Sequence, residues 1–292
     1  MAGAARALYT WPMQHPGAIL KARGLQASRR RGQNFLNQPA TAQAIAESAG
    51  IGPEDVVVEI GPGLGALTLP LAGLAARVIA LEVDRGVYEA LLAVLAETGA
   101  ANVEPRLMDA LDFDWAAEAA RAGRRLKVAA NLPYSISSPI FFKLLEALAH
   151  WSTATLMVQR EVAERLLAPP GGRDYGRLSV LMQCWCEVRP GLVVGPDQFF
   201  PRPQVESRVA HLAPRERPLA ELDGPGQAAW YSQVVKAAFS QRRKTLLNSL
   251  AGGLGRARPE VEAALVRAGI DPSRRAETLS PAEFGRVAVE LT

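Results

Sequence analysis

The tetrapeptide Asn131-Leu132-Pro133-Tyr134 follows an apolar, strand-like run and has residue types suited to chemistry on an amine. The amide oxygen of Asn131 can accept a hydrogen bond from an exocyclic amino group, as can the Leu132 carbonyl, which Pro133 keeps out of helical pairing. Carbonyl dipoles in a water-poor pocket would stabilise the positive charge that develops on a nitrogen as it attacks a methyl group. Tyr134 adds an aromatic face on which an unpaired base can stack, a contact typically worth ~1–3 kcal/mol. The tetrapeptide predicts methyl transfer to a base amine, and a plain strand-ending turn is the alternative.

A glycine-rich turn comes after an earlier strand-like run, VVVEI, at residues 56–60. Gly61, Gly63 and Gly65 would let the backbone turn tightly and approach a ligand closely. Their G-x-G-x-G spacing differs from the G-x-G-x-x-G of a dinucleotide site, and no Gly-Lys-Ser/Thr follows. The turn therefore disfavours NAD and ATP as ligands.

Acidic residues end the next two strand-like runs. Glu82 stands where a carboxylate can accept hydrogen bonds from the two hydroxyls of a ribose, and Asp109 can accept one from an adenine amine. Either acid alone could be a helix cap. Together with the glycine turn, they predict a nucleoside cofactor without a polyphosphate, as in S-adenosylmethionine.

The elements that must position these residues alternate along residues 56–159. Strand-like runs at 56–60, 78–83, 103–107, 127–131 and 154–159 are separated by amphipathic or buried helical patterns. This alternation predicts an α/β fold, with a doubly wound, mostly parallel sheet covered on both faces. Ligands of such sheets bind beyond the carboxyl ends of the strands, where the residues above are placed.

The pattern changes after a strand-like run at 207–212. A Pro-bearing segment follows, and the remaining chain is helical with no convincing strand. Asp271-Pro272 and Ser280-Pro281 are predicted helix starts, and Gly252, Gly253 and Gly255 are predicted to break a helix. We therefore expect a basic N-terminal extension at 1–30, a catalytic domain at 31–214, and a small all-helical RNA-binding domain at 215–292.

Composition limits the class of protein. With 292 residues and 49% hydrophobic side chains, the chain can bury a sizeable core. No apolar run approaches the ~20 residues of a membrane span, and Pro12 and Pro16 interrupt the place of a signal peptide. Cys184 and Cys186 would point to one face of a strand without forming a favourable disulfide. These features predict a cytoplasmic protein in a reducing compartment, with no membrane contact.

Charge is distributed unevenly along the chain. Residues 1–46 contain six basic and no acidic residues, 215–292 contain 12 basic and nine acidic, and the middle contains 15 basic and 20 acidic. Basic flanks of this kind predict a polyanionic partner, because arginines that neutralise phosphates gain affinity from counterion release. A solvated basic tail and an organelle-targeting peptide are the alternatives for the N-terminal part.

A series of motifs in order resembles the ribosomal RNA adenine N6,N6-dimethyltransferases, in particular their bacterial small-subunit branch. The motifs span about residues 25–290 and are GQNFLN (32–37), VEIGPGLGALT (58–68), LEVD (81–84), DAL (109–111), NLPYSISSPI (131–140), MVQREVAERL (157–166), YGRLSVL (175–181), FFPRPQVESRV (199–209) and FSQRRKTLLNSL (239–250). The resemblance implies a Rossmann-like class I S-adenosylmethionine-dependent methyltransferase. It also implies dimethylation of N6 on two adjacent adenosines in the 3′-terminal hairpin loop of 16S rRNA, linked to 30S subunit biogenesis.

The resemblance assigns roles by position. Catalysis would rest on Asn131, Leu132, Pro133 and Tyr134, and the cofactor would contact Asn34, Leu36, Gly61, Gly63, Glu82, Asp109 and Asn131. Phe199 or Phe200 would oppose Tyr134 across the target base, with core packing as the alternative for each. Arg29, Arg30, Arg31, Arg242, Arg243 and Lys244 would hold RNA phosphates, and a solvated helix face is the alternative for the last three.

The expected partner is 16S rRNA within the small subunit or its precursor, bound by a monomer. The three histidines have no metal-ligand spacing, so no metal is expected. Two rival hypotheses remain: a large-subunit rRNA methyltransferase of the same fold, and an RNA-binding assembly or transcription factor that has lost catalysis.

Overall fold

The computed structural model describes residues 15–28, 31–133, 137–222, 226–241 and 243–292. Contacts divide the chain into two compact units. The N-terminal unit comprises Met1–Ala163 and Arg189–Ala213, and the C-terminal unit comprises Glu164–Val188 and Pro214–Thr292. This division assigns residues 164–188 to the C-terminal unit, whereas the sequence interpretation placed them in the catalytic domain.

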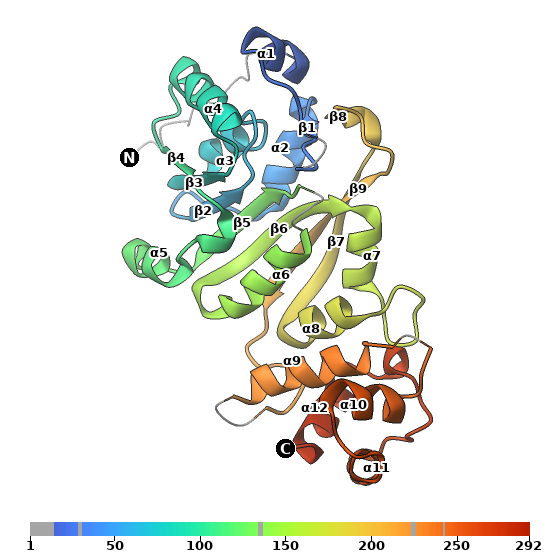
Figure 1. Ribbon diagram of the computed structural model, residues 1–292. Helices are drawn as coiled ribbons and strands as arrows, with labels where there is room; N and C mark the ends of the chain where they lie inside the picture. The colour runs from blue at the N-terminus through green and yellow to red at the C-terminus, as the bar shows by residue number, and fades with distance from the viewer. Residues whose placement is uncertain (1–14, 29–30, 134–136, 223–225, 242) are drawn as a thin grey trace. The chain divides into compact units, whose positions relative to one another are not determined.

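A seven-stranded sheet, in the order β4-β3-β2-β5-β6-β9-β7, forms the centre of the fold (Figure 1). Five strands run parallel, and β9 pairs antiparallel with β6. The bounds are β2 Val56–Ile60, β3 Arg77–Glu82, β4 Val103–Leu107, β5 Leu126–Asn131, β6 Trp151–Gln159, β7 Cys186–Val194 and β9 Ser207–Pro214. The order reverses between β2 and β5, so their carboxyl ends flank a topological switch point, where ligands of open α/β sheets bind. The predicted doubly wound, mostly parallel sheet is confirmed.

Helices cover the sheet on both faces. On one face, apolar residues of α2 and α3 pack on Val57, Val78 and Ala129 of the strands, and α4 packs beside them on β3. Figure 1 shows α6 lying over the other face. The bounds are α1 Pro16–Ala22, α2 Pro39–Ser48, α3 Thr68–Leu74, α4 Arg85–Thr98, α5 Trp115–Ala122, α6 Ser137–Glu146 and α7 Arg160–Leu167, with short 3₁₀ turns η1 Ala110–Asp112, η2 Leu148–His150 and η3 Pro196–Gln198.

A separate two-stranded ribbon joins distant parts of the sequence. β1 (Phe35–Leu36) pairs antiparallel with β8 (Phe199–Phe200), so that Phe35 lies opposite Phe200 and Leu36 opposite Phe199. Just after the ribbon, the Asn37 amide N donates to the Gln198 carbonyl at 3.0 Å. This pairing brings the GQNFL and FFPRP motifs together.

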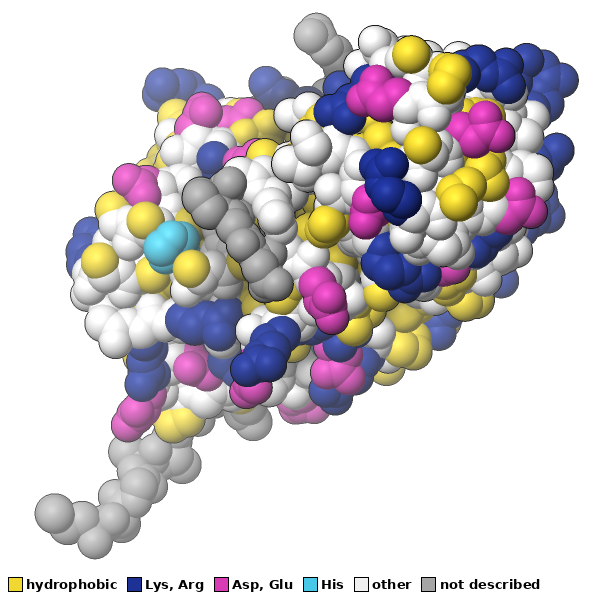
Figure 2. Space-filling model, turned by 90° about the horizontal axis from the view of Figure 1, so that it is seen from below, with side chains coloured by type: hydrophobic (Ala, Val, Ile, Leu, Met, Phe, Trp, Pro, Cys, Tyr) yellow, Lys and Arg dark blue, Asp and Glu magenta, His cyan; other side chains and the backbone are white. Residues whose placement is uncertain are grey.

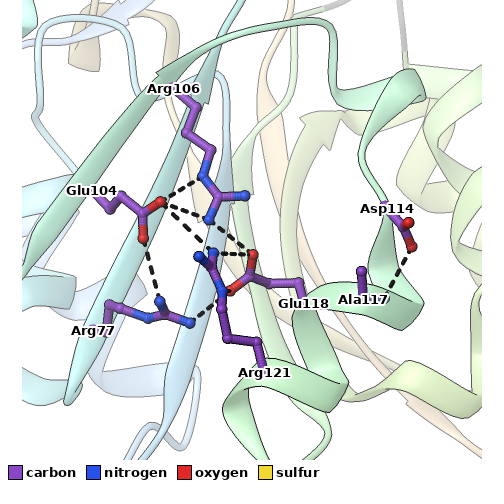
Figure 3. Close-up of polar contacts among 7 residues, drawn as sticks. All are labelled: Arg77, Glu104, Arg106, Asp114, Ala117, Glu118 and Arg121. Carbon is purple, nitrogen blue, oxygen red and sulfur yellow. Dashed lines mark hydrogen bonds and ion pairs between the residues drawn. The ribbon is translucent and has the colours of Figure 1, made fainter.

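An ion-pair cluster fastens the β4 edge of the sheet to α5 (Figure 3). The Glu118 carboxylate, only 5% exposed, accepts hydrogen bonds from Arg77 at 2.6 Å and Arg106 at 2.8 Å, and also from Arg121. Glu104 on β4 pairs with Arg106 of the same strand and with Arg77 of the adjoining β3. Burial raises the pKa of Glu118, but the hydrogen bonds from Arg121 and Arg106 outweigh it, and the pKa is lowered.

The C-terminal unit is built on helices with clear local end signals. Ser280 caps the last helix by accepting from the Glu283 amide, and Glu283 accepts in return from the Ser280 amide. The bounds are α8 Arg177–Trp185, α9 Gln227–Ala238, α10 Leu246–Leu254, α11 Arg258–Arg267 and α12 Pro281–Glu290, with a 3₁₀ turn η4 at Ala276–Thr278.

Three local sequence interpretations were wrong. Cys184 and Cys186 do not share a strand, because α8 ends at Trp185 and β7 begins at Cys186. Both thiols are buried, and burial raises the pKa of Cys186 to about 12. Gly252 and Gly253 lie inside α10, and only Gly255, at φ +66°, ends it. No described helix begins at Asp271-Pro272, which forms a turn.

Candidate cofactor and substrate site

A pocket with ≈ 1050 Å³ of space, part of it open to solvent, lies at the carboxyl ends of β2, β3, β4 and β5. It is therefore at the switch point of the sheet. Five chain segments supply its lining, within residues 31–36, 59–67, 81–83, 108–110 and 131–133. The first of these is the segment that leads into β1, which is not part of the large sheet.

The structure brings the predicted cofactor and catalytic residues together. The lining includes Asn34, Leu36, Gly61, Gly63, Glu82, Asp109, Asn131, Leu132 and Pro133. Tyr134 lies outside the described residues. The individual roles of these residues stay predictions, but their convergence follows from the parallel sheet, whose strand ends meet at one edge.

The glycine turn has the backbone geometry that its sequence predicted. Gly61 and Gly63 have φ of +71° and +58°, a region that favours glycine. A Cβ on Gly63 would lie 3.0 Å from the Phe35 ring, so β1 packs directly on the turn. A side chain at position 63 would therefore press against β1.

Glu82 is buried, at 6% exposure, and is held by the main chain around it. Its Oε1 accepts from the amides of Val83 at 3.0 Å and Asp84 at 2.9 Å, and its Oε2 from the amide of Gly63 at 3.3 Å. Burial raises its pKa, while the hydrogen bonds from Asp84 and Gly63 oppose that rise. Carboxylate oxygens have several acceptor sites, so Glu82 is fixed in place and can still accept from ribose hydroxyls.

Asp109 caps a short turn and also lines the pocket. One of its oxygens accepts from the Leu111 amide at 2.9 Å and caps η1, and the residue also lines the pocket. Its second oxygen can serve an adenine amine. Met108 and Val83, which lie beside Asp109 and Glu82 in the lining, add apolar surface suited to a purine.

Glu59 is a pocket residue to which the sequence interpretation gave no role. It is 1% exposed, and among the described residues its Oε2 has no hydrogen-bond partner. Burial raises its pKa to about 8; the Thr68 side chain lowers it by a smaller amount, and the nearby Glu82 carboxylate adds to the rise. At neutral pH it is thus largely protonated. An acid directly before the glycine turn was the only sequence signal for it.

Asn131 ends β5 and is oriented by a contact from Asn34, the residue just before β1. Its Nδ2 donates to the Asn34 carbonyl oxygen at 3.0 Å, so its Oδ1 is left as an acceptor. The Leu132 amide N donates to the Met157 carbonyl at 3.0 Å, which ties the start of the tetrapeptide to β6. The turn thus offers two carbonyl oxygens, one from a side chain and one from the main chain.

The structure distinguishes the two phenylalanines. Phe199 is 3% exposed and belongs to the core that α2 and α3 form on the sheet, so its aromatic ring serves packing. Phe200 is half-buried, contacts the cluster around Phe35 and Leu64, and meets the His15 ring edge-on at 5.0 Å. Phe200 remains the candidate for base stacking.

Sequence comparison identifies the family. The profile described as "Ribosomal RNA adenine dimethylase" matches residues 24–292. The chain belongs to this family of rRNA adenine dimethylases. It is thus an S-adenosylmethionine-dependent enzyme that methylates rRNA adenines.

Relatives of this dimethylase cover nearly the whole chain. A protein of Moorella thermoacetica named "Ribosomal RNA small subunit methyltransferase A" is 45% identical over 94% of this chain and 96% of its own length. A protein of the same name from Anaeromyxobacter dehalogenans is 44% identical over 92% of this chain and 95% of its own length.

Solved structures show the same fold. The 23S rRNA methyltransferase ErmE superimposes with a TM-score of 0.65 at 30% identity, covering 88% of this chain and 99% of ErmE. A dimethyladenosine transferase from Plasmodium falciparum superimposes with a TM-score of 0.70 at 26% identity, covering 88% of this chain and 96% of the transferase. These neighbours confirm the predicted class I methyltransferase fold.

The predicted RNA-binding residues of the dimethylase are in different environments. Arg31 is paired with Asp84, the N-cap of α4, at the pocket, so its guanidinium is engaged there. Arg243 and Lys244 are exposed just before α10. Arg29, Arg30 and Arg242 lie outside the described residues. Figure 2 shows Lys and Arg side chains spread among acidic ones over the face that it presents, without one continuous basic patch.

Two absences concern the described part of the dimethylase. No group of three or more His, Cys, Asp or Glu side chains there is placed to hold a metal ion. No helix among the described residues is long and apolar enough to cross a membrane.

Proposed function

We propose that the protein transfers methyl groups from S-adenosylmethionine to N6 of two adjacent adenosines in the 3′-terminal hairpin loop of 16S rRNA. It would act as a monomer in the cytoplasm, on the small subunit or its precursor. The substrate is favoured by relatives of 42–45% identity that carry the small-subunit name. The observation that carries the chemistry is the placement of Asn131, Leu132 and Pro133 at the switch point, in the same pocket as Glu82 and Asp109.

The pocket suits the cofactor at both ends. Glu82 would accept from the ribose hydroxyls and Asp109 from the adenine amine, with Val83 and Met108 against the purine. The orphaned Oε2 of buried Glu59 would face the cofactor from beside the glycine turn. Bound there, S-adenosylmethionine supplies an electrophilic methyl group on a sulfonium.

On the acceptor side, Asn131 Oδ1 and the Leu132 carbonyl would each accept a hydrogen bond from one N–H group of the adenine amine. These two hydrogen bonds would orient the amine nitrogen for attack on the methyl group that the cofactor supplies. Both carbonyl dipoles stabilise the charge that develops on nitrogen. The nitrogen would then lose a proton to water, and the neutral monomethylated amine could take a second methyl group while its one remaining N–H donates to one of the two carbonyls.

Phosphate contacts would come from the basic residues. Arg243 and Lys244 flank the N-terminus of α10, where positive side chains are unfavourable to the helix dipole and are better satisfied by an anion. Phe200, together with Tyr134, would stack on the target base. Replacing both Arg243 and Lys244 with Ala should weaken RNA binding and flatten its salt dependence by about two phosphate contacts.

The first test is nucleoside mass spectrometry of unmethylated small subunits incubated with the protein and labelled S-adenosylmethionine. The expected product is labelled N6,N6-dimethyladenosine in the 3′-terminal fragment of 16S rRNA. The Asn131→Ala variant should lower kcat by about 10²–10³ while leaving RNA affinity almost unchanged, because phosphate contacts supply most of the binding.

Two results would contradict the proposal. Label in 23S rather than 16S rRNA would assign the substrate of ErmE-like enzymes, to which the fold is also similar. Tight binding to the subunit without any label would favour a non-catalytic assembly factor.

A further inference from the structure

The amide of Asn131 is oriented by main chain from a segment 97 residues earlier in the sequence. A side-chain amide carries oxygen and nitrogen on opposite branches of one plane, and a main-chain carbonyl can only accept a hydrogen bond. Since Nδ2 of Asn131 lies 3.0 Å from the Asn34 carbonyl oxygen, the nitrogen must face Asn34. The Oδ1 atom of Asn131 then points away from Asn34.

The Asn34 carbonyl is itself held in place. The side-chain Nδ2 of Asn34 donates to the Gly32 carbonyl at 3.2 Å, across a turn in which Gly32 has a φ of +63°. On the other side, Phe35 and Leu36 are 7% and 3% exposed and pair with β8. The carbonyl therefore sits between a locked turn and a buried strand.

We propose that Asn34 is a positioning residue for methyl transfer, because its carbonyl selects the rotamer of Asn131 in which the amide oxygen meets the adenine amine. This inference rests on the proposed function. In the opposite rotamer the Asn131 NH₂ would face the substrate NH₂, donor against donor. The charge that develops on the substrate nitrogen would then meet the positive end of the amide dipole, so the same side chain would oppose the reaction.

The proposal makes a specific prediction for Asn131→Asp. An ionised carboxylate has only acceptors, so it is repelled by the Asn34 carbonyl although it could attract a cationic amine. A protonated carboxyl group can donate its O–H to Asn34 and keep its C=O for the amine. If orientation matters, the variant is active only when protonated. If an acceptor is sufficient, the ionised variant is active.

The test is kcat of Asn131→Asp on unmethylated small subunits from pH 5.5 to 8.5, divided by the wild-type kcat at each pH. The division removes the titration of other groups that line the pocket, namely Arg31, Glu59, Glu82 and Asp109. We expect the relative kcat to be lowest at pH 8.5 and to recover by about tenfold per pH unit as the pH falls, for as long as the pH is above the pKa of the introduced carboxyl group. A ratio that stays flat, or that rises with pH, overturns the proposal.

Asn102→Asp is the matched control. Asn102 also donates through Nδ2 to main-chain carbonyls, those of Ala72 at 2.9 Å and Ala75 at 3.1 Å, but it does not line the pocket. The kcat of Asn102→Asp divided by the wild-type kcat should not vary with pH. Circular dichroism and thermal unfolding check that both variants are folded.

A second measurement decides the matter if Asn131→Asp does not fold. In ¹⁵N spectra of the wild-type protein, one side-chain amide proton of Asn131 should be shifted downfield and protected from exchange, as expected of a hydrogen-bonded donor. Its resonance is identified by its absence from Asn131→Ser. An Asn131 amide with the shifts of a free side chain overturns the inference. Failure of the wild type to methylate the subunit would overturn the proposed function, and the spectrum would still test the hydrogen bond.

Discussion

Replacing Glu59 with Gln should stabilise the protein, and by more as the pH rises from about 4.5 to 8. Burial raises the pKa of Glu59 from 4.5 to about 8. Over that range the unfolded chain has an ionised Glu59 and the folded protein a protonated one. The folded state therefore binds more protons, and its free energy of unfolding falls with increasing pH by up to about 1.4 kcal/mol per pH unit.

The magnitude follows from the same shift. The rise in pKa from 4.5 to about 8 limits the stabilisation by Glu59→Gln to about 5 kcal/mol above pH 8. Below about pH 4 the substitution should have no effect on stability through this pKa. Gln has nearly the same volume and never ionises, so it removes this cost. The raised pKa of Glu82 gives both proteins a slope of the same sign, and the comparison removes this slope except for the part that comes from the repulsion between Glu82 and Glu59.

The assay is urea unfolding of wild type and Glu59→Gln at pH 5, 6, 7, 8 and 9. The difference in free energy of unfolding should grow in favour of Gln up to about pH 8 and then level off. Glu97→Gln, an exposed position on α4, is the control and should show no such trend. A difference that is constant between pH 5 and 8, or that favours Glu59 at high pH, would refute the burial argument.

The other predictions concern stability away from the pocket. Glu118→Gln should lower the free energy of unfolding by about 2–3 kcal/mol at pH 7 in denaturant unfolding, because it leaves three arginines without their shared carboxylate. Since the pKa of Glu118 is lowered in the folded protein, this loss should shrink as the pH falls below 4.5. An undiminished loss at about pH 3 would contradict the role of the ion pairs. Gly253→Ala should cost ~1–3 kcal/mol, since its Cβ would lie 2.7 Å from the Cβ of Ala237 and 2.8 Å from its Cα. Gly73→Ala, in a helix with no atom within 4 Å of the new Cβ, should instead gain roughly 0.5–1 kcal/mol, and equal effects at the two glycines would contradict the packing.

The convergence of Glu82, Asp109 and Asn131 could be predicted because it depends only on local patterns and on a general rule. Each residue ends or follows a strand-like run, and parallel strands place their carboxyl ends at one edge. The environment of Glu59 could not be predicted, because its raised pKa depends on full burial among distant elements. The same holds for the Asn34 carbonyl, whose contact with Asn131 requires the β1–β8 ribbon.

Short spacings were the source of local errors. Two cysteines separated by one residue fit a strand, but the buried residues Val180, Leu181 and Cys184 are spaced for one face of a helix, and this longer pattern is the one that the chain follows. Likewise, adjacent phenylalanines cannot be ranked from sequence. Alternation across β8 buries Phe199 and leaves Phe200 half-buried.

The C-terminal unit takes α8 from the middle of the sequence, and this makes it a discontinuous module. The chain passes between the units three times, after Ala163, Val188 and Ala213. Within the C-terminal unit, α8 packs against α9 and α12. A fragment cut at residue 214 would therefore lack one helix of its core and expose the apolar residues that α8 covers. The C-terminal unit of this enzyme cannot be transplanted as a tail, and any exchange between relatives must carry residues 164–188 with it.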